Sequence, residues 1–401
     1  MSARGAAAIV AAVALAGCRG GGGQGPRAAV RDSAGVTIVE NAGPSWPGGA
    51  GWRVAGAPTL DLGGVAGDSA RDFLGVVGAV RLSSGGVVVA NSGTGQLRFF
   101  DAGGRFVRAV GRRGRASGEF QAIGWLQRGG GDSLVVFDRQ LNRVTLLGPD
   151  GALARTIDLV APDSTGLLQA VGRFPSGDLL AATVPYLRAV TRSGPVRLHV
   201  PYLRVDTAGV AHAVAVFWSD EVFVAVSNGL VTAAPLPFGR STRAAVAGDG
   251  FVAGDGSTYE IDAYTSDGVL RRRIRRAHPP VVVTAADLTR YIGERLLGVA
   301  DPVQRSRREQ FWQRAPLPGA LPAFGEIRTG PEAELWVEEL ERPNVPSTRR
   351  AIFDSAGRWL GLVDLPPGFT PLDVGVDYLL GRWKDADEVE HVRLYPLDRR
   401  R

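Results

Sequence analysis

The sequence of 401 residues predicts an all-β fold, a six-bladed β-propeller with four-stranded antiparallel blades. Three observations lead to this prediction. An Asp–Gly turn recurs six times, strand-like apolar segments flank most of the turns, and each end of the chain holds an incomplete repeat that the other end could complete. Repeats spaced tens of residues apart in a chain of short strands are typical of propellers.

The recurring turn places an Asp ahead of a closing Gly. Asp hydrogen-bonds readily to its own backbone and Gly adopts a positive φ without strain, so both residues suit a tight hairpin. The first copy, Asp32–Gly35, and the last, Asp354–Gly357, share the sequence DSAG. Apolar segments before and after the turns are typical of strands. The closing glycines are Gly35, Gly104, Gly151, Gly209, Gly268 and Gly357.

The two ends of the chain have opposite defects. The N-terminal copy is a turn and a strand, VTIVEN, with no blade before it, whereas the C-terminal segments YLLGRW and EHVRLYPL lack a final strand. We therefore expect Val36 to Glu40 to complete the last blade, so that an N-terminal strand closes the ring. Closure limits the number of exposed sheet edges. The propeller is then predicted to occupy residues 31–401.

One junction carries a family resemblance. Residues 110–121, VGRRGRASGEFQ, are similar to the G-x-x-G-x-x-x-GEF connection between the blades of NHL-type propellers. Together with the hairpin pattern over residues 31–397, this segment resembles the NHL-type six-bladed β-propeller lipoproteins of bacteria. The resemblance implies the propeller fold and rests on hairpin pattern more than on an invariant motif.

The longest step between turns, from Gly268 to Gly357, requires an insertion. Residues 284–314 are predicted to supply it as two helices. Thr284 is placed to cap the first helix with Asp287 three residues later, as in a capping box, and Leu288, Ile292 and Leu296 follow at helical spacing. Pro302 is placed to begin the second helix. The pair is either a structural cap over the channel or a blade junction, or a lid on which a partner docks.

The first 30 residues predict export and a membrane anchor. An apolar run, AAAIVAAVALA, is too short to span a bilayer but has the length of a signal-peptide core. It leads into Leu15-Ala16-Gly17-Cys18, which resembles the lipobox of bacterial lipoproteins. We expect residues 1–17 to be a lipoprotein signal peptide, Cys18 to be lipidated, and residues 18–30 to be a flexible tether. A plain signal peptide and a chance match are the alternatives.

The lone cysteine and the residue after it bear on location. A single Cys forms no intramolecular disulfide, and lipidation accounts for its presence in an oxidising compartment. Arg19 follows it, and by resemblance to enterobacterial sorting the absence of Asp there favours the outer membrane. The expected location is the bacterial cell envelope, lipid-anchored and on the periplasmic side.

Composition limits the partners. The formal net charge is +6, and Lys384 is the only lysine, so the basic residues are almost all arginine. A basic chain often binds nucleic acid, but an exported protein seldom meets it, and no nucleic-acid partner is expected. The run Arg271 to Arg276, RRRIRR, has two interpretations. It contacts lipid head groups, or it forms an outermost strand whose charges discourage edge pairing.

The sequence predicts no zinc site, no catalytic nucleophile and no cofactor. The four histidines, His199, His212, His278 and His391, form no H-x-x-x-H pair, and His391 is expected to point outward from its strand. No G-x-S-x-G motif occurs, and no glycine cluster leads into a helix as a phosphate loop does. Calcium is an alternative, since oxygen-bearing residues fall at the ends of second strands: Asn91, Asp138, Asp255 and Glu338.

Two functions therefore stand at this point. The first is a non-catalytic envelope lipoprotein that binds a peptide, glycan or protein partner, with Trp125, Trp218 and Trp312 as weak candidates for a binding face. The alternative is a calcium-dependent lactonase or hydrolase with its site in the propeller channel, by analogy with the gluconolactonase family. Three or more convergent carboxylates or amides at the channel mouth would favour the enzyme, and an apolar or arginine-rich funnel would favour binding.

Overall fold

The computed structural model describes residues 27–47, 50–64, 67–162, 167–185, 187, 190–227 and 230–400. The predicted signal peptide, the lipidation site Cys18 and most of the predicted tether lie outside these residues. The tether was expected to reach residue 30, but strand β1 already begins at Ala28 and pairs along its length with strand β2. The tether prediction is therefore wrong at its C-terminal end.

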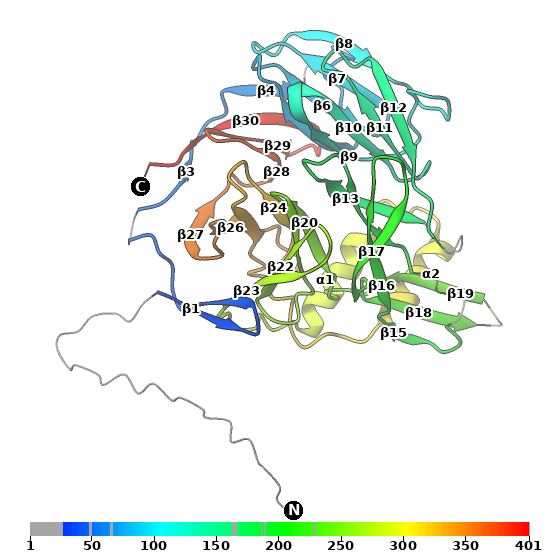
Figure 1. Ribbon diagram of the computed structural model, residues 1–401. Coiled ribbons are helices and arrows are strands. Elements are labelled where there is room, and N and C mark those ends of the chain that lie inside the picture. Colours follow the sequence, from blue (N-terminus) through cyan, green and yellow to red (C-terminus); the bar gives the residue numbers. More distant parts are fainter. Residues whose placement is uncertain are drawn as a thin grey trace, which may run out of the picture.

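The described strands form six sheets with at least four strands each, numbered here in chain order (Figure 1). The first sheet contains β5 (Val76–Arg81), β6 (Val87–Asn91), β7 (Gln96–Phe100) and β8 (Phe106–Val110). The second contains β9 (Ile123–Arg128), β10 (Leu134–Asp138), β11 (Arg143–Leu147) and β12 (Leu153–Asp158), with a 3₁₀ turn at Gly130–Asp132. The third contains β13 (Leu168–Arg173), β14 (Leu179–Thr183), β16 (His199–Val205) and β17 (Ala211–Trp218).

The remaining sheets follow the same antiparallel order. The fourth sheet contains β20 (Arg243–Ala247), β21 (Gly250–Gly254), β22 (Glu260–Thr265) and β23 (Leu270–Arg276). The fifth contains β24 (Ile327–Thr329), β25 (Leu335–Glu338), β26 (Arg349–Phe353) and β27 (Trp359–Asp364). The sixth contains β28 (Phe369–Val374), β29 (Tyr378–Lys384) and β30 (Glu390–Asp398), joined by β4 (Leu60–Gly63) and β3 (Arg53–Val54) from the N-terminal part of the chain.

The sheets pack as the blades of a β-propeller. First strands of neighbouring sheets contact one another: β5 lies against β9 and β28, and β20 lies against β13 and β24. Apolar clusters fill the junctions between neighbouring sheets, and the sixth sheet shares one with the first, where Leu62 and Val392 pack with Val76 and Val87. Burial between sheet faces is the main stabilising contribution in such a fold.

Each sheet has two functionally different ends. Because adjacent strands are antiparallel, the turns after the first and third strands leave at one end, here called the turn end. The connection after the second strand and the link to the next sheet leave at the other, here called the connection end. The long insertions all lie at the connection end, so the two ends of the propeller have different surfaces.

The turn prediction is confirmed at all six closing glycines, which have φ between 78° and 92°. Five of these turns join the third and fourth strands of a sheet, and the turn at Gly35 joins β1 (Ala28–Ser33) to β2 (Val36–Asn41). This φ range is strained for residues with a Cβ atom, so the glycine is required by the backbone conformation.

Gly268→Ala is expected to destabilise the protein far more than Gly35→Ala. Both glycines have nearly the same φ, 83° and 81°, so both substitutions cost about 1–2 kcal/mol in backbone strain. At Gly268, however, a Cβ atom lies 1.7 Å from the backbone oxygen of Val214, whereas nothing lies within 4 Å at Gly35. Urea unfolding of the two variants tests this contrast, and equal losses of stability would contradict it.

The predicted position of the N-terminal strand is wrong. Strand β2, which includes Val36 to Glu40, pairs in parallel with β23 of the fourth sheet and does not complete the last sheet. The strand that pairs with β30 is β4, about two dozen residues further along the chain. Between them the chain follows the fifth sheet, where the Ser45 and Trp46 N–H groups donate to the carbonyls of Trp359 and Leu360. We call residues 27–47 and 50–64 the N-terminal strap.

The prediction for the basic strand is also wrong in one respect. β23 is the fourth strand of its sheet as expected, but it is not an edge, because β2 pairs with it. Its charges do not prevent this pairing, since carboxylates neutralise three of its five arginines: Arg275, for example, binds Glu40 of β2 itself, at 3.1 Å, and Glu260, at 2.6 Å. Paired charges no longer repel an incoming strand.

The predicted helical insertion is confirmed as α1 (Ala285–Leu296) and α2 (Pro302–Gln313). Thr284 and Asp287 form the capping box, and Pro302 occupies the first turn of α2. The helices pack against a three-stranded side sheet of β15 (Gly194–Val196), β18 (Val222–Ser227) and β19 (Leu230–Pro235), which the sequence did not predict. Neither of these two helices is long and apolar enough to cross a membrane.

Candidate functional site

Two of the three candidate tryptophans belong to the packing of the fold. Trp125 lies in β9, not in a connection, and its indole Nε1 donates to the carbonyl of Ala170 in the next sheet, at 2.7 Å. Trp312 is 8% exposed in the core between the helices and the side sheet. Only Trp218, at the end of β17, is exposed, with its ring stacked on His199 at 3.6 Å between centroids.

The oxygen-bearing residues at the ends of second strands have a shared structural role in three of four cases. Asn91, Asp138 and Glu338 each accept a backbone N–H from the segment just before the first strand of their own sheet. The donors are Leu74 at 2.9 Å, Gln121 at 2.6 Å and Glu326 at 3.0 Å. These side chains therefore hold connections in place and do not converge on one another.

Histidines do not form a cluster either. In the part of the chain that the structure describes, no three His, Cys, Asp or Glu side chains gather as metal ligands would. His391 does not point outward as expected: its side chain is 12% exposed, and Nδ1 lies 2.7 Å from Asp61 of β4. His278 packs beside Tyr259, and burial lowers its pKa.

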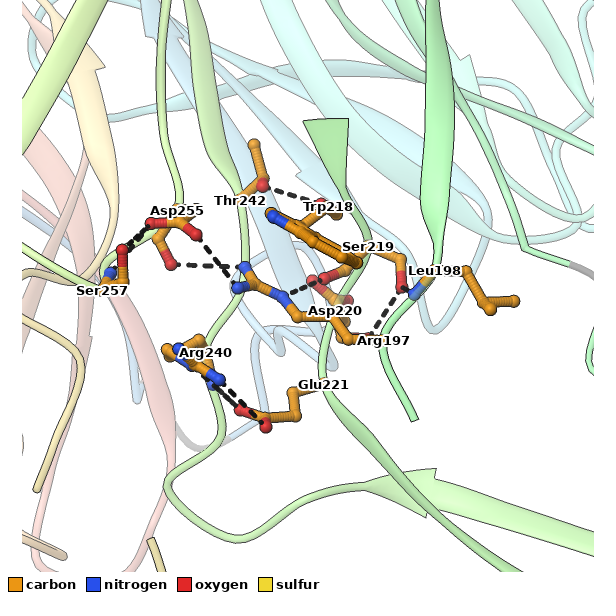
Figure 2. Close-up of polar contacts among 10 residues, drawn as sticks. All are labelled: Arg197, Leu198, Trp218, Ser219, Asp220, Glu221, Arg240, Thr242, Asp255 and Ser257. Carbon is orange, nitrogen blue, oxygen red and sulfur yellow. Dashed lines mark hydrogen bonds and ion pairs between the residues drawn. The ribbon is translucent and has the colours of Figure 1, made fainter. Parts of the chain in front are cut away.

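Asp255 is the exception among the second-strand ends, and it marks the candidate site. It follows β21 at the connection end of the fourth sheet, but its partner comes from the third sheet (Figure 2). Arg197, between β15 and β16, donates to its carboxylate at 3.0 Å and to its carbonyl at 3.3 Å. Arg197 also donates to the carbonyl of Ser219, at 3.0 Å, and its side chain is only 10% exposed.

A cavity of about 390 Å³ opens next to this ion pair, at the connection ends of the third and fourth sheets. We call it the side cavity. Its volume lies within the range of small-ligand pockets. Four separate connections form its wall, including the segment after α2. The lining residues are Pro195, Glu221, Leu236, Phe238, Arg240, Gly256, Ser257, Pro316, Leu317, Pro318, Gly319, Ala320 and Leu321.

A second ion pair forms part of the cavity wall. Arg240 approaches Glu221 with Nε 3.3 Å from the carboxylate, and its backbone N–H donates to the same oxygen at 3.1 Å (Figure 2). Burial alone raises the pKa of Glu221, but the hydrogen bonds and charge of Arg240 outweigh it, so the pKa lies below its ordinary value. The same pair raises the pKa of Arg240.

Asp255 is held ionised in a similar way. Burial raises the pKa of Asp255, but hydrogen bonds from Ser257 and the charge of Arg197 outweigh it and lower the pKa overall. Carboxylates with lowered pKa values stay charged near neutral pH and are poor proton donors. The wall therefore offers the fixed charges of Glu221 and Arg240 for recognition, with ionised Asp255 beside the cavity, and neither carboxylate is suited to act as a general acid.

Backbone strain also lies at the side cavity. Phe238, which lines it, has a φ of 56°, a region that a bulky residue rarely adopts. Such a conformation costs on the order of 1–3 kcal/mol and is often found at functional sites. A ring contact with Tyr291 of α1, at 5.5 Å between centroids, holds Phe238 in place. The helical insertion thus supports one wall of the cavity.

At the turn ends of the first three sheets, near the centre of the propeller, arginines occupy one register position. Arg81, Arg128 and Arg173 are each the last residue of a first strand, opposite the first residue of the second strand. Carboxylates lie among these arginines: Asp132 is 3.4 Å from Arg128, and Asp377 is 3.7 Å from Arg81. Asp373 accepts the backbone N–H of Arg81 at 3.0 Å, and its burial raises its pKa. Both charges are present in this region, so its composition favours neither the binding protein nor the enzyme.

Comparisons with known proteins identify the fold of the chain but show neither its family nor its function. No family model matches the chain, and no curated protein matches it. Among solved structures, a member of the DUF4221 family from Bacteroides vulgatus ATCC 8482 has a TM-score of 0.51 at 9% identity, covering 87% of this chain and 99% of that one. A protein described as exported, from Bacteroides fragilis NCTC 9343, has a TM-score of 0.49 at 12% identity, covering 91% and 100%.

An enzyme of the same general architecture is more distant. Virginiamycin B lyase from Staphylococcus aureus has a TM-score of 0.41 at 10% identity, covering 86% of this chain and 99% of that one. At these identities a likeness bears on fold and not on chemistry. The chain thus has the architecture of a β-propeller, and its function has to be argued from its own residues.

Proposed function

We propose that the protein is an exported, lipid-anchored, six-bladed β-propeller of the NHL type. The six sheets and the apolar clusters at their junctions, including the one between the sixth and first sheets, support a closed ring. The NHL-like junction is well ordered around its GEF segment: Phe120 is fully buried and Glu119 binds Arg112 at 2.6 Å. Export and anchoring rest on residues 1–18 of the sequence.

Its function, we infer, is to bind a partner polypeptide without catalysing a reaction, with a short segment of the partner in the side cavity. The observation that carries this proposal is the pairing of ionised Glu221 with Arg240 in a wall that also presents the apolar side chains of Leu236, Phe238 and Leu317. Walls that combine apolar side chains with a few fixed polar groups suit peptide side chains. A polyhydroxylated glycan favours more hydrogen-bonding groups and an exposed aromatic platform.

Leu317→Trp is expected to block the side cavity and weaken peptide binding at least tenfold. Leu317 lines the cavity and is 37% exposed, so a larger ring fills the space without removing a buried contact. The probe is a peptide selected by the wild-type protein from a displayed library of random sequences, and its affinity is measured by calorimetry. Leu297→Trp is the matched control, because Leu297 is 76% exposed and lies outside the cavity.

The result that overturns the proposal is also specific. Equal peptide affinities for both variants and the wild type would remove the side cavity from the function. Turnover of a lactone or ester panel by the wild type, dependent on calcium and retained by Leu317→Trp, would favour the channel enzyme instead.

Cys18→Ala is expected to abolish the lipid anchor. The thiol is the group that accepts the lipid, so the variant should lose palmitate labelling and appear in soluble fractions or as unprocessed precursor. Labelling followed by membrane fractionation checks this result. A variant that still labels and sediments with outer membranes would contradict the lipobox interpretation.

A further inference from the structure

The basic strand β23 contains two groups of arginines with different environments. Three of its five arginines bind carboxylates: Arg273 binds Asp262 at 2.8 Å, Arg275 binds Glu260 at 2.6 Å, and Arg276 binds Glu339 at 2.7 Å. These pairs join strands of the fourth sheet, or the fourth sheet to the fifth. These three ion pairs stabilise the fold, and this role explains three of the five positive charges of β23.

Arg271 and Arg272 have no carboxylate partner among the residues that the structure describes. Arg272 donates from Nη1 to the carbonyl of Ser355, at 2.6 Å, while its Nε is buried with no acceptor. Arg271 is exposed, at a bulge in the pairing of β22 and β23.

Both arginines line a second cavity, of about 320 Å³, at the turn ends of the fourth and fifth sheets. We call it the turn-end cavity. It lies at the opposite end of the fourth sheet from the side cavity. Its floor is apolar, with Phe251, Ile274 and Leu335 each no more than 3% exposed. A cavity with an apolar floor and cationic groups beside it suits an amphiphilic anion.

Two carboxylates also line this cavity, and only one of them is uncompensated. Asp354 binds Arg358 at 2.7 Å and accepts backbone N–H groups of its own turn, including that of Ala356 at 3.0 Å. Asp249 has no ion pair among the described side chains. The two free guanidinium groups therefore exceed the one free carboxylate, and the cavity has a net positive charge.

We propose that the turn-end cavity binds a phosphate ester that carries a short apolar chain. Guanidinium groups bind phosphate through paired, charge-assisted hydrogen bonds, and both Arg271 and Arg272 line this cavity. The apolar chain would occupy the floor formed by Ile274 and Leu335. The same chemistry occurs in soluble phosphate esters and in anionic lipid head groups. This site is independent of peptide binding in the side cavity.

The test uses hexyl phosphate as a soluble probe and the full-length mature protein. Arg271→Gln is expected to weaken binding, measured by calorimetry, roughly tenfold, because hydrogen bonds to charged groups typically contribute that much. Arg308→Gln, which removes the same charge from an exposed position on α2, is expected to leave the affinity unchanged. Asp249→Asn is expected to tighten binding, since it removes the free carboxylate.

Parallel sedimentation with vesicles of phosphatidylglycerol or phosphatidylcholine identifies the source of the phosphate group. Binding of hexyl phosphate that depends on Arg271 supports a soluble ester. Sedimentation with phosphatidylglycerol alone, lost in Arg271→Gln and retained in Arg308→Gln, supports a lipid head group. Equal effects of the two arginine variants in both assays, or no binding of either probe, would overturn the proposal. Leu317→Trp should bind both probes like the wild type, which separates this site from the side cavity.

Discussion

A chain that begins at residue 65 should fail to fold, although it lacks only the N-terminal strap and keeps all the remaining strands of the six sheets. It lacks β4, whose Leu62 is fully buried in the core shared by the sixth and first sheets. It also lacks Asp61, which binds Arg393 at 2.8 Å and His391 at 2.7 Å. Losing a buried strand exposes both the core and β30, and the cost approaches the whole stability of a domain, about 5–15 kcal/mol.

The control is a chain that begins at residue 43, which loses β1 and β2 but keeps β4. It should fold with reduced stability, because β2 covers the outer edge of the fourth sheet, with Ile38 and Val39 buried, and its Asn41 hydrogen-bonds to Gly357 and Trp359 of the fifth sheet. Circular dichroism and urea unfolding distinguish the two truncations. If the shorter chain melts like the longer one, β4 has no role in completing the sixth sheet. Deleting residues 31–41 should likewise affect the fourth sheet and not the last.

Glu339→Ala should be among the most destabilising single substitutions in the protein. Glu339 lies after β25, is 4% exposed, and holds both nitrogens of the Arg276 guanidinium at 2.7 and 3.0 Å. It also accepts the hydroxyl of Tyr259 at 2.7 Å, and burial raises the pKa of that tyrosine well above its ordinary value. Removing the carboxylate leaves a buried cation unpaired, which typically costs about 3–5 kcal/mol.

Two further variants serve as controls for the expected loss of stability in Glu339→Ala. Glu341→Ala removes an ion pair of similar length, 2.8 Å to Arg349, from the surface and should cost no more than about 1 kcal/mol. The double variant Glu339→Leu with Arg276→Met should recover much of the loss, since a buried pair can be replaced by apolar residues of similar volume. Chemical unfolding measures all three. A loss in Glu339→Ala no greater than in Glu341→Ala would show that the pair contributes little.

Features set by a few consecutive residues could be predicted from the sequence. The Asp–Gly turns depend on a positive φ at one glycine, and the capping box depends on Thr284 and Asp287 alone. Each of these is a local interaction whose energetics do not depend on the rest of the chain. For the same reason, the four-strand order of the sheets followed from the spacing of the turns.

Features set by residues that are distant in the sequence could not be predicted from it. Both β2 and β4 are short apolar strands, and the pattern VTIVEN is the stronger of the two, but the partner of each depends on the path of the strap along the fifth sheet. Trp46 and Trp52, which pack against Trp336 there, carry no signal for that path in their local sequence. Trp125 was misplaced because a strand end and a connection look alike when glycine precedes them.

The candidate sites are also set by residues that are distant in the sequence. The four connections that form the side cavity are spread over residues 195–321, and no short motif joins Glu221 to Arg240 and Leu317. The signal that could have been used is indirect: Asp255 stands at a position where three equivalent residues hold their own connections. In the basic strand, the sequence shows five arginines, but only the structure shows which of them lack a carboxylate.

The pairing of β4 with β30 also sets the order of events during biosynthesis. Asp61 and Arg393 are 332 residues apart in the chain, and the ribosome makes the first long before the second. At about 5–20 residues per second, β4 waits tens of seconds for its partner. During that time Leu62 and the edge of β4 are exposed, while sheets one to five can each form from neighbouring segments. The sixth sheet is therefore the last to be completed, and a segment from the N-terminal part of the chain completes it.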